Sequence, residues 1–317
     1  MSMSHGSRAI GRLQVVATAV LFSTGGAAIK STALGGLEVA SLRSAFAAAA
    51  LASFLAWDAR RTRRRCDAAR TGRADRLDRF ALGVALSYAA TMTLFVVATK
   101  LTTAANAIFL QASAPLFVAP LAYSALGERV ERADIALMAA LAVGVALFFA
   151  GVREPVATAP APLLGNCAAI ACALVWAMTV VGLRRLEARG RDAARLTLLP
   201  GNLLVAAVAG VLASWRTPIH AADWLIVGYL GVVQIAVAYV LLTRGVRRIP
   251  ALEASLLLLL EPVLSAVWAW LVHGEAVSAL AGMGGAVVVV ATALRAWLRQ
   301  RASSVGLARR REENATP

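Results

Sequence analysis

The chain has 317 residues, of which 60% are apolar and 15% are charged, whereas a soluble domain has about 45–50% and about 25%. The mean hydropathy of +0.72 leaves too few polar residues to cover a water-soluble protein of this size. The composition therefore excludes a soluble enzyme and predicts an integral membrane protein.

Ten apolar stretches are long enough to cross a membrane, because a helix that rises about 1.5 Å per residue needs about 20 residues to span about 30 Å of hydrocarbon. In chain order they are residues 13–29, 37–57, 80–98, 103–125, 135–151, 163–183, 196–213, 224–242, 252–272 and 280–298. The sequence predicts an all-α membrane protein with ten transmembrane helices.

The net charge of +15 arises from 32 basic residues against 17 acidic ones. With the N-terminus inside, 27 of the 32 fall in inner segments and only 4 in outer ones, and the remaining one, Arg43, lies within a span. Basic residues collect in cytoplasmic loops, so both termini are predicted to be cytoplasmic. The basic run at residues 60–65 has no interleaved aromatic residues for base stacking. We therefore expect contact with membrane lipid and not with nucleic acid.

An internal repeat relates the two halves of the chain. Ala114-Pro115-Leu116 matches Glu261-Pro262-Val263, and Gly127-Glu128 matches Gly274-Glu275, both at an offset of 147 residues. Chance agreement between two alanine- and leucine-rich stretches is the alternative explanation. Five spans per copy is an odd number, so the second copy must enter the membrane from the opposite side. Inverted repeats of this kind are typical of secondary transporters, which bind substrate near the midplane between the halves.

This division predicts four parts. They are a cytoplasmic N-terminus (1–12), a first five-helix repeat (13–153), a second five-helix repeat (163–298) and a basic cytoplasmic tail (299–317).

Several short motifs carry a family resemblance that extends from about residue 13 to residue 298. In the second half they are Tyr229-Leu230-Gly231, Ala238-Tyr239, Arg248-Ile249-Pro250-Ala251, Leu260-Glu261-Pro262-Val263 and Gly274-Glu275. In the first half they are Leu42-Arg43, Thr103-Ala104-Ala105-Asn106, Ala114-Pro115-Leu116 and Leu126-Gly127-Glu128-Arg129. Together they resemble the EamA-type transporters of the drug/metabolite transporter superfamily. The resemblance implies ten helices in two inverted repeats, a central cavity and export of small metabolites. Phe22-Ser23 departs from the family's usual Trp-Gly, while Trp176-Ala177 is closer to it.

Glu261 is the carboxylic acid that lies deepest in a predicted span, next to Pro262. An ionisable group within a span costs at least about 2.5 kcal/mol, which calls for an explanation. One hypothesis is that Glu261 carries a coupling proton or binds a substrate amine. The alternative is a neutral carboxylic acid that only hydrogen-bonds a neighbouring helix. Pro262 and its counterpart Pro115 are expected to break or bend their helices near the midplane.

Arg43 lies within the second predicted span, about 9 Å from its outer end. As a pathway residue it would bind a substrate carboxylate through two parallel hydrogen bonds, or pair with Glu261. As a structural residue it would extend to the outer interface and anchor the helix there.

Other polar and aromatic residues at membrane depth complete the candidate pathway. Gln111 and Gln234 are the deepest amides and could bind either end of a zwitterion or link helices. Asn106, Asn166 and Asn202 lie nearer span ends, where packing is the better interpretation. Trp176 and Tyr239 are candidate cavity residues by the family resemblance.

Catalytic and cofactor motifs are absent from the sequence. Its three histidines, His5, His220 and His273, are far apart, the three cysteines form no CxxC pair, and no phosphate-binding lysine motif is present. We therefore expect no metal, no cofactor and no enzymatic activity.

The predicted function is export of small metabolites by a multi-pass secondary transporter of the bacterial inner membrane. Amino acids or related compounds are the expected substrates, with exchange for protons as the coupling. The alternatives are a facilitator or antiporter for other small solutes such as nucleobases or drugs, or a membrane binding or scaffold protein that transports nothing. The expected partners are the substrate, protons and membrane lipid, and the protein could be a monomer or a homodimer.

Overall fold

The computed structural model describes residues 5–63, 77–127, 131–152, 154–189, 193–249 and 251–313. In the first half it forms α1 (His5–Ser23), α2 (Gly25–Lys30), α3 (Gly36–Arg63), α4 (Arg79–Leu101), α5 (Ala104–Gln111), α6 (Pro115–Leu126) and α7 (Arg132–Ala150). In the second half it forms α8 (Pro162–Ala188), α9 (Ala193–Leu212), α10 (Ala221–Gly228), the π-helix η1 (Tyr229–Val237), α11 (Ala238–Gly245), α12 (Ala251–Leu258), α13 (Leu260–His273) and α14 (Ala279–Glu313). Glu128, Arg129, Pro250 and most of the loop between α3 and α4 lie outside the described residues.

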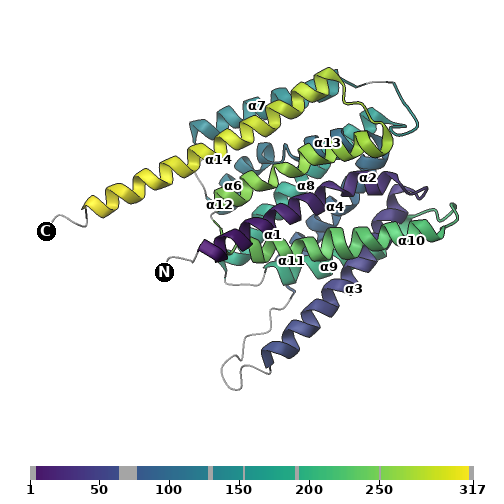
Figure 1. Ribbon diagram of the computed structural model, residues 1–317, viewed down its shortest axis with the longest axis horizontal. Coiled ribbons are helices and arrows are strands. Elements are labelled where there is room, and N and C mark those ends of the chain that lie inside the picture. The colour runs from purple at the N-terminus through teal and green to yellow at the C-terminus, as the bar shows by residue number, and fades with distance from the viewer. Residues whose placement is uncertain are drawn as a thin grey trace.

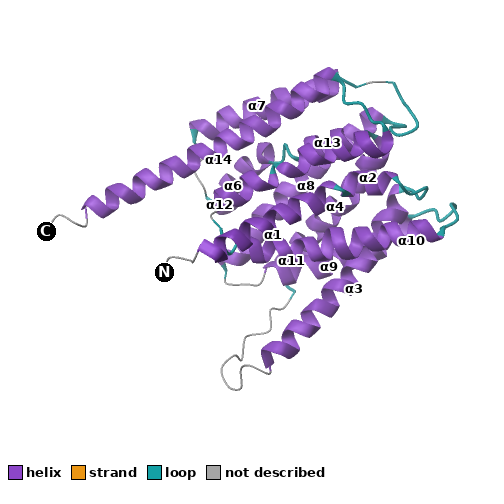
Figure 2. Cartoon of the chain, in the orientation of Figure 1, coloured by secondary structure: helices purple, strands orange, loops and turns teal. Residues whose placement is uncertain are grey.

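The helices run side by side in one bundle, and the described residues contain no strand (Figures 1 and 2). The start of α1 and the end of α14 lie at the same end of the bundle (Figure 1). The opposite end, where α2 ends at Lys30 and α13 ends at His273, is called the far end below.

Nine helical segments of the described chain are long and apolar enough to cross a membrane. The seventh predicted span corresponds to a shorter apolar helix, Leu196–Leu212, within α9. Large apolar side chains remain exposed on the outer helix faces, for example Val211 at 85% and Leu225 at 76%. Such exposure would be unfavourable in water but suits helices that face lipid. The structure is that of an all-helical, multi-pass membrane protein.

Two predicted spans are interrupted at their prolines. Pro115 is the first residue of α6, and the preceding turn closes with a hydrogen bond of 3.0 Å from the Ala114 amide to the Gln111 carbonyl. Pro262 lies in the first turn of α13, and the break before it is at Leu259. Proline has no N–H group to continue the helical hydrogen bonds and its ring clashes with the preceding turn, which explains both breaks.

Two further predicted spans, residues 13–29 and 224–242, are irregular although neither contains a proline. The first span breaks at Thr24, where the hydroxyl groups of Ser23 and Thr24 bond carbonyls three residues back and two glycines follow. The eighth span contains the π-helix η1, whose Tyr229 hydroxyl is hydrogen-bonded to the Thr24 hydroxyl at 2.7 Å. The two irregular segments are therefore joined to each other.

The helices pack in matching pairs from the two halves. α4 packs against α8, and the repeat-related pair, α11 and α1, packs in the same way. α3 packs against its own counterpart α9, and α7 packs against its counterpart α14. α7 and α14 form one edge of the bundle (Figure 1). There a Cβ atom added to Gly144 would lie 3.1 Å from the Gly284 carbonyl oxygen, so the two backbones approach closely.

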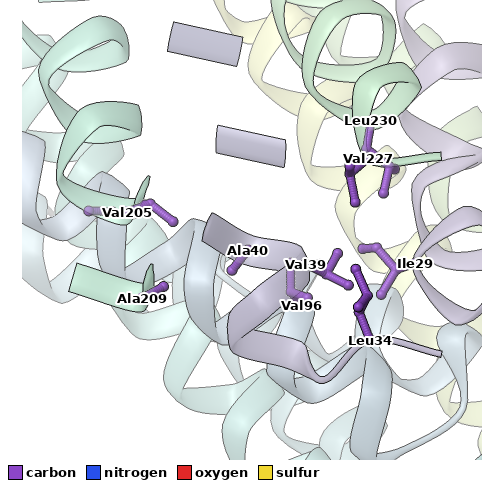
Figure 3. Close-up of a cluster of buried hydrophobic side chains, with 10 residues drawn as sticks. Ile29, Leu34, Val39, Ala40, Val96, Val205, Ala209, Val227 and Leu230 are labelled. Carbon is purple, nitrogen blue, oxygen red and sulfur yellow. The ribbon is translucent and has the colours of Figure 1, made fainter. Parts of the chain in front are cut away.

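A buried hydrophobic cluster holds α3 in place beside α2, α4, α9, α10 and η1 (Figure 3). The cluster contains Ile29, Leu34, Val39, Ala40, Ala89, Val96, Val205, Ala209, Val227 and Leu230. Close packing of this kind fixes a helix against its neighbours, and it sets the position of the α3 segment that carries Arg43.

Candidate functional site

A central cavity of about 330 Å³ lies between the two halves of the chain. All eight pathway and helix-break residues selected from the sequence line it: Arg43, Gln111, Pro115, Trp176, Gln234, Tyr239, Glu261 and Pro262. Its other lining residues are Phe22, Met92, Phe95, Ile108, Ala112, Ala114, Ile235, Leu258 and Leu259. Residues from distant parts of the sequence thus share one mainly apolar chamber with a few polar groups, which is the usual character of a small-molecule site.

The interruptions of the helices converge on this cavity. Phe22 lies just before the α1/α2 break, Ala112 lies between α5 and α6, Ile235 belongs to η1, and Leu259 separates α12 from α13. Irregular backbone at membrane depth is tolerated where it is buried in protein or lines a cavity, because its free polar groups can then be satisfied. The cavity is therefore built around the broken segments.

Arg43 is buried in the wall of the cavity, and its side chain does not extend to the membrane surface. The residue is 1% exposed, and its Nη2 atom donates a hydrogen bond of 2.9 Å to the Met92 carbonyl. Its Nε atom has no hydrogen-bond partner. The interpretation of Arg43 as an interfacial anchor is wrong, because the packing of α3 against α4 and η1 encloses its side chain.

Glu261 follows the break in the ninth span at Leu259. It lies in the first turn of α13 and lines the same cavity. Among the described residues its carboxylate forms no hydrogen bond and no ion pair, and it is not paired with Arg43. A carboxyl group that served only to link helices would need such a hydrogen bond. The cavity thus holds one cationic and one acidic side chain that are not paired with each other.

The two deep glutamines add uncharged polar groups to the wall. Gln234 belongs to η1 and packs against Gly25, where an added Cβ atom would lie 2.8 Å from the Gln234 Nε2 atom. The Gln234 Oε1 atom has no hydrogen-bond partner. Gln111 is the last residue of α5 and lines the cavity beside the α5/α6 break.

The three asparagines do not line the cavity and bond to neighbouring groups, as expected for packing residues. Asn166 Oδ1 accepts a hydrogen bond of 2.8 Å from the Thr102 hydroxyl, and Asn106 Nδ2 lies 3.5 Å from the same oxygen. Asn202 Nδ2 donates to the Tyr88 hydroxyl at 3.2 Å.

Aromatic rings form one side of the chamber. The Tyr239 ring lies edge-on to Phe22, with centroids 5.3 Å apart, and to Tyr88, with centroids 6.4 Å apart. Tyr88 does not line the cavity but packs behind Tyr239; its hydroxyl group within the third span is a polar signal that the sequence interpretation did not use. Sequence reasoning missed apolar lining residues such as Met92 and Phe95, which carry no signal that distinguishes them from lipid-facing residues.

Comparison with known proteins places this architecture in a family. The model of the EamA-like transporter family matches residues 9–150 and 163–296. The chain belongs to this family. EamA-like transporters belong to the drug/metabolite transporter superfamily, as the motifs around Arg43, Pro115 and Glu261 indicated. The two matched segments cover the first and second halves of the chain.

Two relatives of known sequence are similar over much of this EamA-like chain. An uncharacterized transporter of Archaeoglobus fulgidus is 26% identical over 288 residues, which cover 90% of this chain and 96% of the relative. An uncharacterized transporter of Clostridium kluyveri is 26% identical over 212 residues, which cover 65% of this chain and 67% of the relative. A crystal structure with 22% sequence identity superposes with a TM-score of 0.58 over 93% of this chain and 98% of the other. That similarity supports the fold.

Proposed function

We propose that this EamA-like transporter exports small metabolites across a bacterial inner membrane by alternating access. In this proposal α9 also crosses the membrane, so that ten spans form two inverted five-helix repeats with both termini in the cytoplasm. The matching helix pairs support the repeat, since inverted halves that enclose a midplane cavity can open it to either side in turn. The far end then faces the outside, and the distribution of basic residues supports this orientation.

We further propose that the substrates are amino acids or related zwitterions. The observation that carries this proposal is the presence of Arg43 and Glu261 in one cavity without an ion pair between them. Buried charges are costly unless they are paired, so a ligand that brings a carboxylate to Arg43 and an ammonium group to Glu261 would compensate both. The amides of Gln111 and Gln234 can bond to either end of such a ligand.

Proton exchange is the proposed coupling, with Glu261 as the residue that carries the proton. A carboxyl group that forms no hydrogen bond or ion pair with the described residues can bind either a proton or the substrate ammonium group. Competition between the two at one site would couple export of substrate to entry of protons.

The test is flux in proteoliposomes for a panel of amino acids, nucleobases and cationic drugs, with and without an imposed pH gradient. We expect gradient-dependent movement of amino acids, and loss of the gradient dependence in Glu261→Gln. Transport of nucleobases or drugs but not amino acids would refute the zwitterion proposal, and flux of Glu261→Gln that still followed the gradient would refute its proton role. Absence of flux for every compound with folded protein would favour a binding or scaffold role.

A further inference from the structure

The far end of the bundle contains a buried ion pair. The Lys30 Nζ atom lies 2.8 Å from the Glu275 Oε1 atom, and the side chains are 4% and 1% exposed. Lys30 is the last residue of α2, and Glu275 lies in the loop between α13 and α14. The pair therefore joins the end of the first span to the segment that follows the ninth.

The same two side chains also hold two other segments together. Lys30 Nζ donates to the carbonyl of Thr102, at the junction of α4 and α5, at 2.8 Å, and to the carbonyl of Thr158, in the loop before α8. Glu275 Oε2 accepts a hydrogen bond of 2.8 Å from the Ala104 amide at the start of α5. A single ion pair thus connects four segments around the far end.

A second, smaller cavity borders this connection. Its volume is about 240 Å³, and Thr102, Asn106 and Glu275 are among its lining residues. It shares no lining residue with the central cavity, although Asn106 and Ile108, two residues apart on α5, line one cavity each. Helix α5 therefore borders both cavities, and Glu275, which lines the smaller one, binds the α5 amide at Ala104.

The opposite end of the bundle is held differently. There an ion pair between Arg12 and Glu253, with side chains 59% and 28% exposed, joins α1 to α12. A buried pair between Arg295 and Asp134 joins α14 to α7 at the edge of the bundle. Exposed ion pairs contribute little to stability, whereas separating a buried pair leaves two charges without compensation. Of the ion pairs among the described residues, Lys30–Glu275 is the one that includes a lining residue of either cavity.

We propose that the Lys30–Glu275 ion pair is the gate of the transport pathway at the far end. The pair separates the central cavity from the smaller cavity, and its dissociation opens the route between them. The smaller cavity is then the exit vestibule that released substrate enters. This proposal rests on the proposed transport function but not on the identity of the substrate.

The test measures access to the central cavity with a cysteine at Ala112, which lines the cavity beside the α5/α6 break. The background is Cys66→Ser/Cys167→Ser, because Cys66 lies in a predicted inner loop and Cys167 is exposed near the far end. A membrane-impermeant methanethiosulfonate reagent is added from outside to intact cells, and from the opposite face to inverted vesicles. We expect slow labelling of the reporter Ala112→Cys from outside, and at least tenfold faster labelling when Lys30→Met or Glu275→Gln is added.

Two further variants isolate the ion pair. The exchanged pair Lys30→Glu/Glu275→Lys should return labelling from outside to the slow rate. Lys100→Met is the matched control, because Lys100 also lies at the far end but donates to Thr32, not to a carboxylate. Its labelling rate should equal that of the parent. If either single variant fails to fold, the double variant Lys30→Met/Glu275→Gln replaces it, because removal of both charges leaves neither unpaired. Its Ala112→Cys reporter should be labelled fast from outside.

Unchanged labelling in the folded single and doubly neutral variants would overturn the proposal, as would a fast rate in the exchanged pair. The readout needs no substrate. Gate opening without amino acid flux would therefore refute the proposed substrate class alone, and flux with unchanged labelling would refute the gate alone.

Discussion

The contact between η1 and α3 beside Arg43 requires glycine at position 231. A Cβ atom added there would lie 2.3 Å from the Arg43 carbonyl oxygen and 2.5 Å from the Phe46 Cβ atom, whereas ordinary van der Waals contact begins at 3.4 Å. We therefore expect Gly231→Ala to force the two helices apart by about 1 Å, and overpacking of this kind costs about 1–3 kcal/mol.

Gly228 is the matched control, three residues earlier at the end of α10. An added Cβ atom there would have nothing within 4 Å, and its φ of −61° is helical. Gly228→Ala should therefore stabilise the helix by about 0.5–1 kcal/mol. The two alanine variants should differ by about 1.5–4 kcal/mol, which corresponds to apparent melting temperatures on the order of 3–15 °C apart.

Thermal unfolding of the purified protein in detergent measures this difference, with tryptophan fluorescence as the signal. Gly231→Ala should also impair transport, because the shift acts on the α3 backbone at Arg43, while Gly228→Ala should retain it. Equal melting temperatures for the two variants would show that η1 and α3 are not in contact at Gly231, and the argument from close approach would fail.

Two other predictions concern charged side chains. Arg43→Lys removes the planar guanidinium and at least one charge-assisted hydrogen bond worth about 1.5–3 kcal/mol. The apparent affinity for a zwitterion, measured in a flux titration, should therefore fall about 12- to 150-fold. Affinity equal to that of the parent would exclude Arg43 as the carboxylate site. Arg295→Met removes the hydrogen bonds of 2.9 Å to Asp134 and 2.7 Å to Glu131 that tie α14 to α7. Loss of one partner of a buried pair costs about 3–5 kcal/mol, so Arg295→Met should melt well below the parent, whereas exposed Arg216→Met should not.

Polarity within apolar spans was sufficient to select the candidate site. Arg43, Gln111, Gln234 and Glu261 were chosen because polar side chains at membrane depth are costly, and all four line one cavity. The proline breaks could be expected for a similar reason, since proline cannot continue a helix wherever it occurs. Both signals are local properties of single residues, which is why the sequence contains them.

The irregular first and eighth spans could not be predicted in this way. Thr24 and the glycines after it are compatible with a continuous helix, and the stretch that forms η1 has ordinary apolar composition. Their geometry depends on contacts between segments, such as the hydrogen bond between the Thr24 and Tyr229 hydroxyl groups and the packing of Gly25 against Gln234. These contacts exist only once the two halves have assembled.

The sequence by itself determined a membrane protein with apolar helical spans and an internal repeat, because hydropathy and motif spacing are read along the chain. Only the tertiary structure decided that Arg43 faces a cavity and not the membrane surface, and that Lys30 pairs with Glu275. The physical reason is that the cost of burying a charge depends on its surroundings, and helices far apart in the sequence supply those surroundings.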